Sequence, residues 1–352
     1  MQKKPFPPEL AGLATYPSAA RIGYSVDENV QRLLRLHWTE RRLMSTMLAH
    51  LASTPEWEVK CALSLHQWYA AEHAEWLRGR IAEMRHPVPP LEESPDAGLN
   101  AFLEEVLRAE TTTELLAGIY GIALPALRDA YYRHVQRTNP LVDHPTVRFM
   151  RFALAEVTEA IDWGEKAIAA VVGDGRTADH ISAWREHLQL YLDSARGIAG
   201  DPAIDMEEGD SRRGSSIRTM EAPLPPPRAS EPFKPDFRPA RDDRFHGLYD
   251  FDFPPHIAYN AEGVPAAERN LALLCKRTLE MDVPEMMSSY LYERNDQPWE
   301  FYLDYSRQLW DEARHSMLGT VAFEARAIRR DEIVLEGNVQ RVAALHRVDE
   351  LR

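Results

Sequence analysis

Glutamates and histidines recur at helical spacing in two distant parts of the chain. Glu312 and His315 lie three residues apart in an apolar stretch, so a helix would place both side chains on one face, where they can bind one metal ion. Glu280 precedes Glu312 by 32 residues, and in the N-terminal part Glu40 precedes Glu72 by the same 32 residues. This repeated spacing indicates two matching helical hairpins that contribute to one site for two metal ions.

Each pair of glutamates is centred on an expected break between two helices. The midpoint of the first pair falls beside the break at 53–55, and the midpoint of the second falls within 295–298. In an antiparallel helix pair, residues equally far from the turn lie at the same level. We therefore expect the two glutamates of each pair to face each other.

Apolar residues recur at helical spacing through most of the chain and predict an all-α protein. Thr54 is the expected N-cap of the second helix. A bend is expected near Gly118, Gly121 and Pro125, and a kink at Pro284. The predicted helices cover residues 26–51, 56–84, 95–137, 144–172, 178–198, 265–294 and 299–330, and one short strand is expected at 332–335.

Residues 200–265 differ in composition from the rest of the chain. They hold 11 of the 25 prolines, so regular structure is not expected there. Their second half is too aromatic for a solvated linker and favours a segment that wraps along the bundle, with Phe233, Phe237, Phe245, Tyr249, Phe251, Phe253 and Tyr259 as its aromatic residues. The chain is therefore divided into an N-terminal extension (1–25), an N-terminal helical part (26–199), this Pro-rich linker (200–264), a C-terminal helical hairpin (265–330) and a tail (331–352).

Composition also limits the partners and the compartment. The formal net charge is −14 and no basic stripe occurs, which argues against nucleic acid as a partner. No run of 18 apolar residues and no signal-peptide core occur, so neither a membrane nor export is expected. Cys61 and Cys275 lie far apart in helical segments, which fits a reducing cytoplasm. Apolar area on the helices after residue 95 would suit a homodimer.

Apolar residues on both sides of Glu312 and His315 favour a metal site over a solvated face. Burying an acid and a base is costly unless they pair with each other or bind a metal. The flanking residues are Leu309, Trp310, Met317 and Leu318.

With these residues the chain resembles the ferritin-like superfamily of di-metal carboxylate proteins, and also large bacterial ferritin-like proteins with no assigned reaction. Such bundles carry one Glu on each of two helices and Glu-x-x-His on each of the other two. Glu280 with Glu312 and His315 matches one half of this pattern. The resemblance covers residues 28–84 and 266–327. It implies a ferritin-like antiparallel helical bundle, here with additional helices and the long Pro-rich wrapping segment.

The other half departs from the ferritin-like pattern. Glu40 and Glu72 fit, but position 75 is Glu75, and the nearest histidine is His73. On a regular helix His73 points about 100° away from Glu72. Three alternatives stay open: Glu75 is the ligand, the helix is locally irregular, or only one metal ion is held.

Glu156 and Glu159 form a further acidic pair at i, i+3 spacing. They are either another source of carboxylate ligands or partners in structural salt bridges, and we favour the salt bridges. The arginines available for such pairs are Arg128, Arg148 and Arg151.

The resemblance implies two iron ions, with manganese or a mixed manganese and iron pair as alternatives. A site of this kind would make the chain an oxygen-dependent oxidoreductase, with O2 and a small organic molecule as substrates. The fold itself does not select a reaction. One alternative is a non-catalytic helical protein that binds metal or a partner. Another is an enzyme that uses Glu312 and His315 as an acid/base pair without metal.

Overall fold

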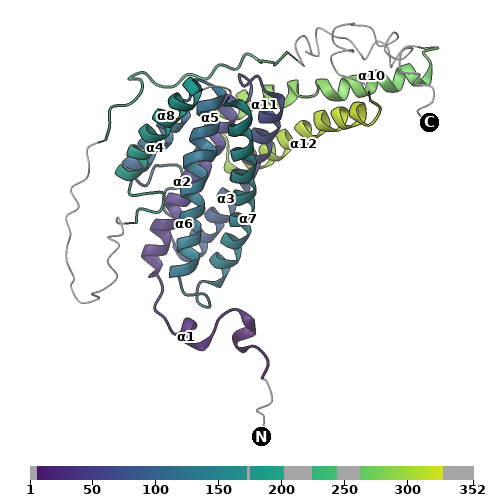
Figure 1. Ribbon diagram of the computed structural model, residues 1–352. Helices are drawn as coiled ribbons and strands as arrows, with labels where there is room; N and C mark the ends of the chain where they lie inside the picture. Colours follow the sequence, from purple (N-terminus) through teal and green to yellow (C-terminus); the bar gives the residue numbers. More distant parts are fainter. Residues whose placement is uncertain (1–5, 173–174, 202–223, 244–261, 328–352) are drawn as a thin grey trace. The chain divides into compact units, whose positions relative to one another are not determined.

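The computed structural model describes residues 6–172, 175–201, 224–243 and 262–327 (Figure 1). In these residues every regular element is helical, so the expectation of an all-α protein is confirmed. The strand expected at 332–335 lies outside the described residues. The elements, in chain order, are η1 (Glu9–Gly12), α1 (Tyr16–Ala19), α2 (Val26–Leu51), α3 (Trp57–Met84), α4 (Ala97–Leu107), α5 (Thr112–Gly118), η2 (Ile119–Ala123), α6 (Leu124–Arg137), α7 (His144–Val171), α8 (Gly175–Ser194), α10 (Ala266–Leu279), α11 (Asp282–Glu293) and α12 (Trp299–Glu324).

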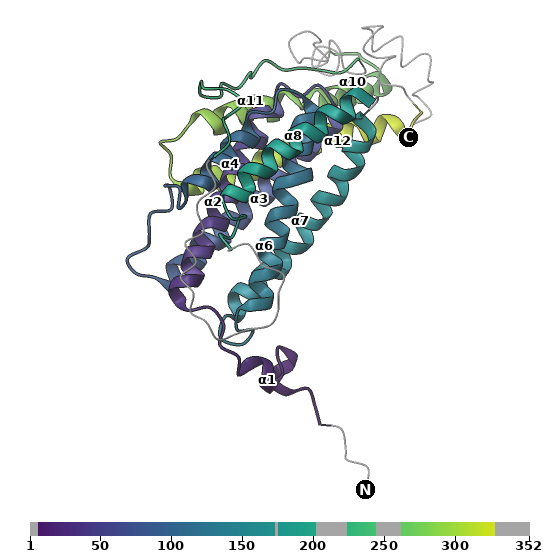
Figure 2. The same ribbon diagram turned by 60° about the vertical axis from the view of Figure 1, so that its left-hand side comes forward.

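The chain forms two compact units, and each combines two separated stretches of sequence. Unit 1 is Met1–Leu43 with Glu72–Phe233, and unit 2 is Met44–Ala71 with Lys234–Arg352. Helices α2 and α3 therefore each contribute residues to both units. Within unit 1, α6 and α7 lie side by side in both views, as do α4 and α8 (Figures 1 and 2). Within unit 2, α12 packs against α10 and α11.

Side-chain caps set the starts of several helices in unit 1. At α2 the Ser25 hydroxyl accepts from the Glu28 amide at 3.2 Å, and Glu28 in return accepts from the Ser25 amide at 2.7 Å. This reciprocal capping box satisfies amide groups that have no partner within the helix. Asp96 caps α4 through the Leu99 amide at 2.7 Å. Thr111 does the same for α5.

The expectation of one bent helix over 95–137 is wrong, because this stretch forms α4, α5, η2 and α6. Arg108 leaves the helical conformation, and the Thr111 cap starts a new helix. Near the expected bend the chain forms η2, a single π-helical turn. Pro125 lacks an amide hydrogen and so cannot donate to the Gly121 carbonyl, which accounts for the irregular turn at this position.

Within unit 2, residues far along the chain form hydrogen bonds with the turn between α2 and α3. Thr54 was the expected N-cap of α3, but its hydroxyl donates back to the His50 carbonyl at 2.8 Å. The carboxylate of Asp242 instead accepts from the Trp57 amide at 3.4 Å. The Ala240 amide also donates to the Ala52 carbonyl at 3.0 Å. Asp242 and Ala240 belong to residues 224–243, which have no helix or strand, as the proline content predicted.

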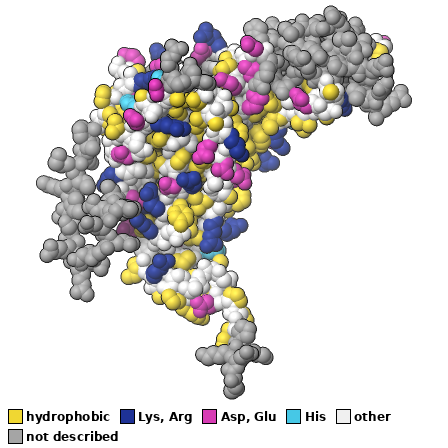
Figure 3. All heavy atoms as spheres, in the orientation of Figure 1, with side chains coloured by type: hydrophobic (Ala, Val, Ile, Leu, Met, Phe, Trp, Pro, Cys, Tyr) yellow, Lys and Arg dark blue, Asp and Glu magenta, His cyan; other side chains and the backbone are white. Residues whose placement is uncertain are grey.

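The distribution of surface charge and the apolar character of the helices bear on possible partners. On the face that Figure 3 shows, Lys and Arg side chains lie among Asp and Glu side chains and do not gather in one stripe. None of the helices in the described part of the chain has the length and apolar character that crossing a membrane requires.

Close packing at Gly164 provides a test of the unit 1 core. A methyl group at Gly164 on α7 would lie 2.2 Å from Cβ of the buried Tyr120 in η2. We expect Gly164→Ala to lower the free energy of unfolding by about 1–3 kcal/mol, because the core must shift to admit it. Gly79→Ala is the matched control: Gly79 lies on α3 with nothing within 4 Å, so the substitution should stabilise by up to about 1 kcal/mol. Urea denaturation measures both, and equal effects would contradict the packing.

Candidate metal centre

Glu280, Glu312 and His315 converge in unit 2, as their spacing predicted. His315 Nδ1 lies 3.0 Å from Glu312 Oε2 and 3.6 Å from Glu280 Oε2. One ligand atom from each residue lies within 4.8 Å of the other two. Among the residues that the structure describes, no other three such side chains converge in this way. We call these three residues the triad.

A break in the helix places Glu280 in the triad. We expected a kink at Pro284, but the helix is interrupted four residues earlier, between α10 and α11. Pro284 has no amide hydrogen, and its ring clashes with the carbonyl four residues before it, which is that of Glu280. The Glu280 carbonyl accepts instead from the Val283 amide at 3.1 Å. Glu280 thereby becomes the C-cap residue of α10, directly after Leu279.

The residues beside Glu280 anchor this break in the unit 2 core. Leu279 and Met281 are each 2% exposed and pack with Trp57 and Cys61 of α3. Because both neighbours point into the core, the short connection at Glu280 cannot rotate freely. The carboxylate is therefore held on the side that faces α12.

Small residues on α12 let it approach the end of α10 closely. The Ser316 hydroxyl donates to the Thr278 carbonyl at 2.9 Å, and it accepts from Trp57 Nε1 at 3.4 Å. A methyl group at Gly319 would lie 2.7 Å from the Thr278 amide nitrogen. This contact sets the distance between Glu280 and His315, one residue before Ser316.

Two polar side chains orient the carboxylates of the triad. Arg277 Nη1 donates to both oxygens of Glu280, at 3.0 and 2.8 Å. Gln308 donates to Glu312 Oε1 at 2.7 Å. Arg277 lies three residues before Glu280, and Gln308 lies four residues before Glu312 on α12. Each carboxylate keeps an oxygen directed at His315.

The apolar enclosure expected around the triad is only partly formed. Leu309 is buried, but the flanking Leu318 is 61% exposed. The side chains of Glu280 and Glu312 are 16% and 18% exposed, and that of His315 is 39% exposed. The triad is thus open to solvent on one side, so a small molecule can reach it.

A second cluster, within unit 1, joins Glu40, His73 and Glu156. His73 Nδ1 lies 2.9 Å from Glu40 Oε1, and His73 Nε2 lies 2.9 Å from Glu156 Oε2. The Tyr131 hydroxyl donates to the same Glu40 oxygen at 2.7 Å. The four residues come from α2, α3, α6 and α7, so the cluster links four helices. The arginine partners favoured for Glu156 are not used, since its partner is His73.

The cluster around His73 does not gather three ligand atoms about one point, because Glu40 and Glu156 lie on opposite ring nitrogens of His73. Burial acts to lower the pKa of His73, but Glu40 and Glu156 outweigh it and raise the pKa to about 9. At neutral pH both ring nitrogens therefore carry protons and donate to carboxylates. In the described residues, three converging ligand atoms occur at the triad and not at this cluster. For Tyr131, burial and the Glu40 carboxylate both raise the pKa above its ordinary value, which keeps its hydroxyl a donor.

The remaining predicted ligands lie apart from both clusters. Glu72 was expected to face Glu40, but His73 takes that position, and in the described residues the half-buried Glu72 has no part in these hydrogen bonds. Glu75 and Glu159 are exposed. Helix α3 is continuous from Trp57 to Met84, so no local irregularity brings Glu75 inward. Neither Glu75 nor an irregular α3 therefore completes this half, and in the described residues three ligand atoms come together only at the triad.

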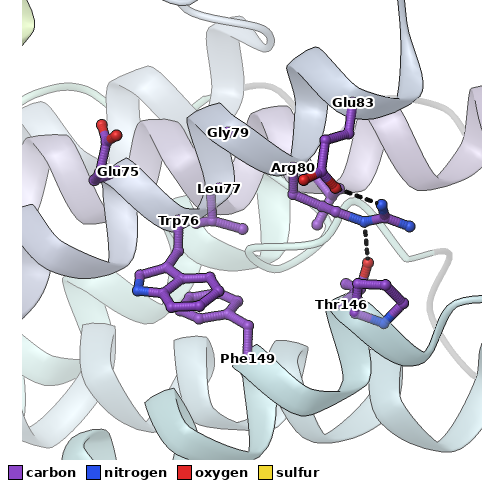
Figure 4. A pocket seen from close by; sticks show the side chains of 10 residues that line it. Glu75, Trp76, Leu77, Gly79, Arg80, Glu83, Thr146 and Phe149 are labelled. Atoms are coloured by element: carbon purple, nitrogen blue, oxygen red, sulfur yellow. Dashed lines mark hydrogen bonds and ion pairs between the residues drawn. The ribbon is translucent and has the colours of Figure 1, made fainter.

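A pocket of about 270 Å³ lies beside the His73 cluster in unit 1 (Figure 4). Trp76 and Phe149 stack at its apolar end, with ring centroids 5.5 Å apart and planes 9° apart. At the other end Arg80 Nε donates to Thr146 at 2.8 Å. The Phe149 ring also meets the edge of the His73 ring, at 5.9 Å between centroids. Phe149 therefore both lines the pocket and contacts the buried cluster.

A buried charge network in unit 2 was missed in the sequence. Lys60 is fully buried and pairs with the buried Glu285, and the Arg241 guanidinium pairs with Glu285 as well. Lys60 Nζ also donates to the carbonyls of Leu51 and Ala52, at 3.1 and 2.7 Å, at the end of α2. Burial lowers the pKa of Lys60 to about 8. In the sequence, the one sign of this network is Lys60 itself, a lysine within an apolar helical stretch.

Comparison of the chain with protein-family models, curated proteins and solved structures finds no match. Inference about function therefore depends on the geometry of these residues.

The His73 cluster predicts a specific dependence of stability on pH. The pKa of His73 is raised from 6.5 to about 9, so its contribution to stability is fully present below pH 6.5 and is lost as the pH rises through 9. We expect the difference in unfolding free energy between the wild type and His73→Gln to shrink over this window by on the order of 3 kcal/mol. Tyr131→Phe is the control, because it removes a donor to Glu40 and leaves the titrating ring in place. Parallel curves for wild type and His73→Gln, from urea denaturation at each pH, would contradict the charged state of His73.

Proposed function

We propose that this chain is a metal-binding helical protein of the ferritin-like kind, in which Glu280, Glu312 and His315 hold one divalent iron or manganese ion. The observation that carries the proposal is the convergence of two carboxylates and one imidazole within 4.8 Å. Carboxylate oxygens and neutral imidazole are ligands that suit iron and manganese. In this proposal the helical units are a ferritin-like bundle with extra helices, and the Pro-rich segment wraps along it.

The triad residues have distinct roles in this proposal. Glu280 and Glu312 supply negative charge to balance a divalent ion, and His315 supplies a neutral nitrogen. Gln308 holds one oxygen of Glu312, and the other oxygen of that carboxylate faces the imidazole. Arg277 holds both oxygens of Glu280, and one of these also lies near His315. These outer hydrogen bonds fix ligand orientation before any ion arrives.

We further propose that the chain is an oxygen-dependent oxidoreductase that acts on a small organic molecule. A bound iron ion supplies the redox chemistry that the side chains lack. The observation that supports this function is the open side of the triad, where His315 is 39% exposed. An exposed face leaves room for O2 and for a substrate next to the three ligands.

The second candidate is a non-catalytic protein in which the triad is a set of ion pairs. The Arg277 guanidinium already balances Glu280, and His315 lies within hydrogen-bond distance of Glu312, so the three residues are paired without a metal. Partner binding would then be the function of the chain. Metal analysis separates the two candidates.

Metal content provides the direct test. Protein purified after growth with iron and manganese should contain roughly one ion per chain, and Glu312→Ala should lose it, because two donors cannot replace three. Asp304→Asn, an exposed acidic position on the same helix, should keep the ion. His73→Gln should keep it as well. Metal content near zero in the wild type favours the non-catalytic candidate, and two ions per chain with loss of one in His73→Gln would restore the two-metal interpretation.

Oxygen reactivity tests the proposed reaction. When the ferrous protein is mixed rapidly with oxygenated buffer, we expect an absorbance change that follows the oxygen concentration and is absent in Glu312→Ala. Asp304→Asn should react like the wild type. An iron-loaded wild type that shows no reaction with oxygen would exclude the oxidoreductase and leave static metal binding.

A further inference from the structure

A short proline-rich segment of unit 1 is bound in an extended form on α4, α5 and α8. The segment is Leu224–Glu231, with the sequence Leu-Pro-Pro-Pro-Arg-Ala-Ser-Glu, and we call it the strap. Three consecutive prolines favour the polyproline II conformation, which exposes its carbonyl groups. The Tyr191 hydroxyl of α8 donates to the Pro225 carbonyl at 2.9 Å. At the other end Arg108 donates to the Glu231 carbonyl at 2.7 Å.

Arg228 is the anchor of the strap. Its two terminal nitrogens donate to the two oxygens of Glu114, at 2.6 and 2.8 Å. Its backbone amide donates to Glu105 at 2.7 Å. The side chains of Glu114 and Glu105 are 0% and 2% exposed. The strap thus places Arg228 against two buried carboxylates.

One face of α8 brings aromatic rings against the strap. The Arg228 guanidinium lies 4.7 Å from the centroid of the Trp184 ring. Trp184 stacks on His187, and the edge of His187 meets Tyr191, with centroids 5.5 and 5.3 Å apart. The spacing of 184, 187 and 191 places the three rings along one helix face. We call these three rings with Glu105 and Glu114 the α8 groove.

The groove has the chemistry of a recognition site. Burying a carboxylate is costly unless a donor meets it, and a fork of two hydrogen bonds to a guanidinium is among the strongest such contacts. Aromatic side chains that contact prolines and hydrogen-bond their carbonyls are the usual way in which proteins bind proline-rich peptides.

We propose that the α8 groove is a peptide-binding surface for proline-rich segments of other proteins, with an arginine three residues after the proline whose carbonyl is bound. The strap is the resident ligand in cis. A segment of the same chemistry binds in trans when it displaces the strap. The proposal is independent of the metal centre.

The cis ligand predicts how binding in trans responds to mutation. A tethered segment competes at an effective concentration in the millimolar range, so an added peptide binds the wild type weakly. Removing the anchor arginine of the strap removes most of this competition. Removing the buried carboxylate removes the site itself.

A labelled synthetic peptide of residues 224–231 tests the proposal by fluorescence anisotropy with the full chain. We expect Arg228→Ala protein to bind this peptide at least about 10-fold more tightly than the wild type. Adding Glu114→Gln to that variant should reverse the gain. A control peptide with alanine in place of the arginine should bind neither protein.

Circular dichroism shows whether the variants fold. If Arg228→Ala does not fold, Arg228→Lys replaces it, because lysine keeps the charge and loses the two-pronged contact. The expected result is then also tighter peptide binding than in the wild type. A folded variant that binds the peptide no better than the wild type, or binds both peptides equally, overturns the proposal and leaves the strap a structural latch.

Discussion

A carboxylate that is removed from water must be met by hydrogen-bond donors, and this requirement organises both units. In unit 1 Glu40 is met by His73 and Tyr131, and in unit 2 Glu285 is met by Lys60 and Arg241. Each network joins helices that are distant in sequence. The apolar core supplies most of the free energy of burial, but it does not specify which faces meet. The charged partners restrict the helices to the pairings in which no buried carboxylate is left alone.

The same requirement distinguishes the two clusters that resemble metal sites. Where a histidine is buried between two carboxylates, as His73 is, it becomes a cation and satisfies them by itself. Where the histidine is partly in water, as His315 is, other side chains meet the carboxylates: Arg277 donates to Glu280, and Gln308 donates to Glu312. Similar residue types at similar spacing thus form different hydrogen-bond arrangements, and the degree of burial differs between them.

Much of the helical arrangement follows from local sequence, and much of the site does not. Helices α2, α3 and α7 begin and end within one residue of expectation, because breaks such as Pro55 and the apolar period define them. Glu312 with His315 follows from a spacing of three on one helix. The role of His73 could not be predicted, since both of its partners lie on other helices. To predict the interruption at Glu280, one must consider how Pro284 affects the carbonyl four residues earlier.

The contact between Asp242 and the start of α3 has a consequence for the order of assembly. The backbone amide of Trp57 donates to the carboxylate of Asp242, which lies 185 residues later in the chain. During synthesis, which proceeds from the N-terminus, the tip of the first helical hairpin therefore emerges long before its cap exists. Lys60 likewise lacks its carboxylate partner until Glu285 is made, which comes later still. The tip of this hairpin is thus among the last parts of the molecule to become native, although it is among the first to be translated.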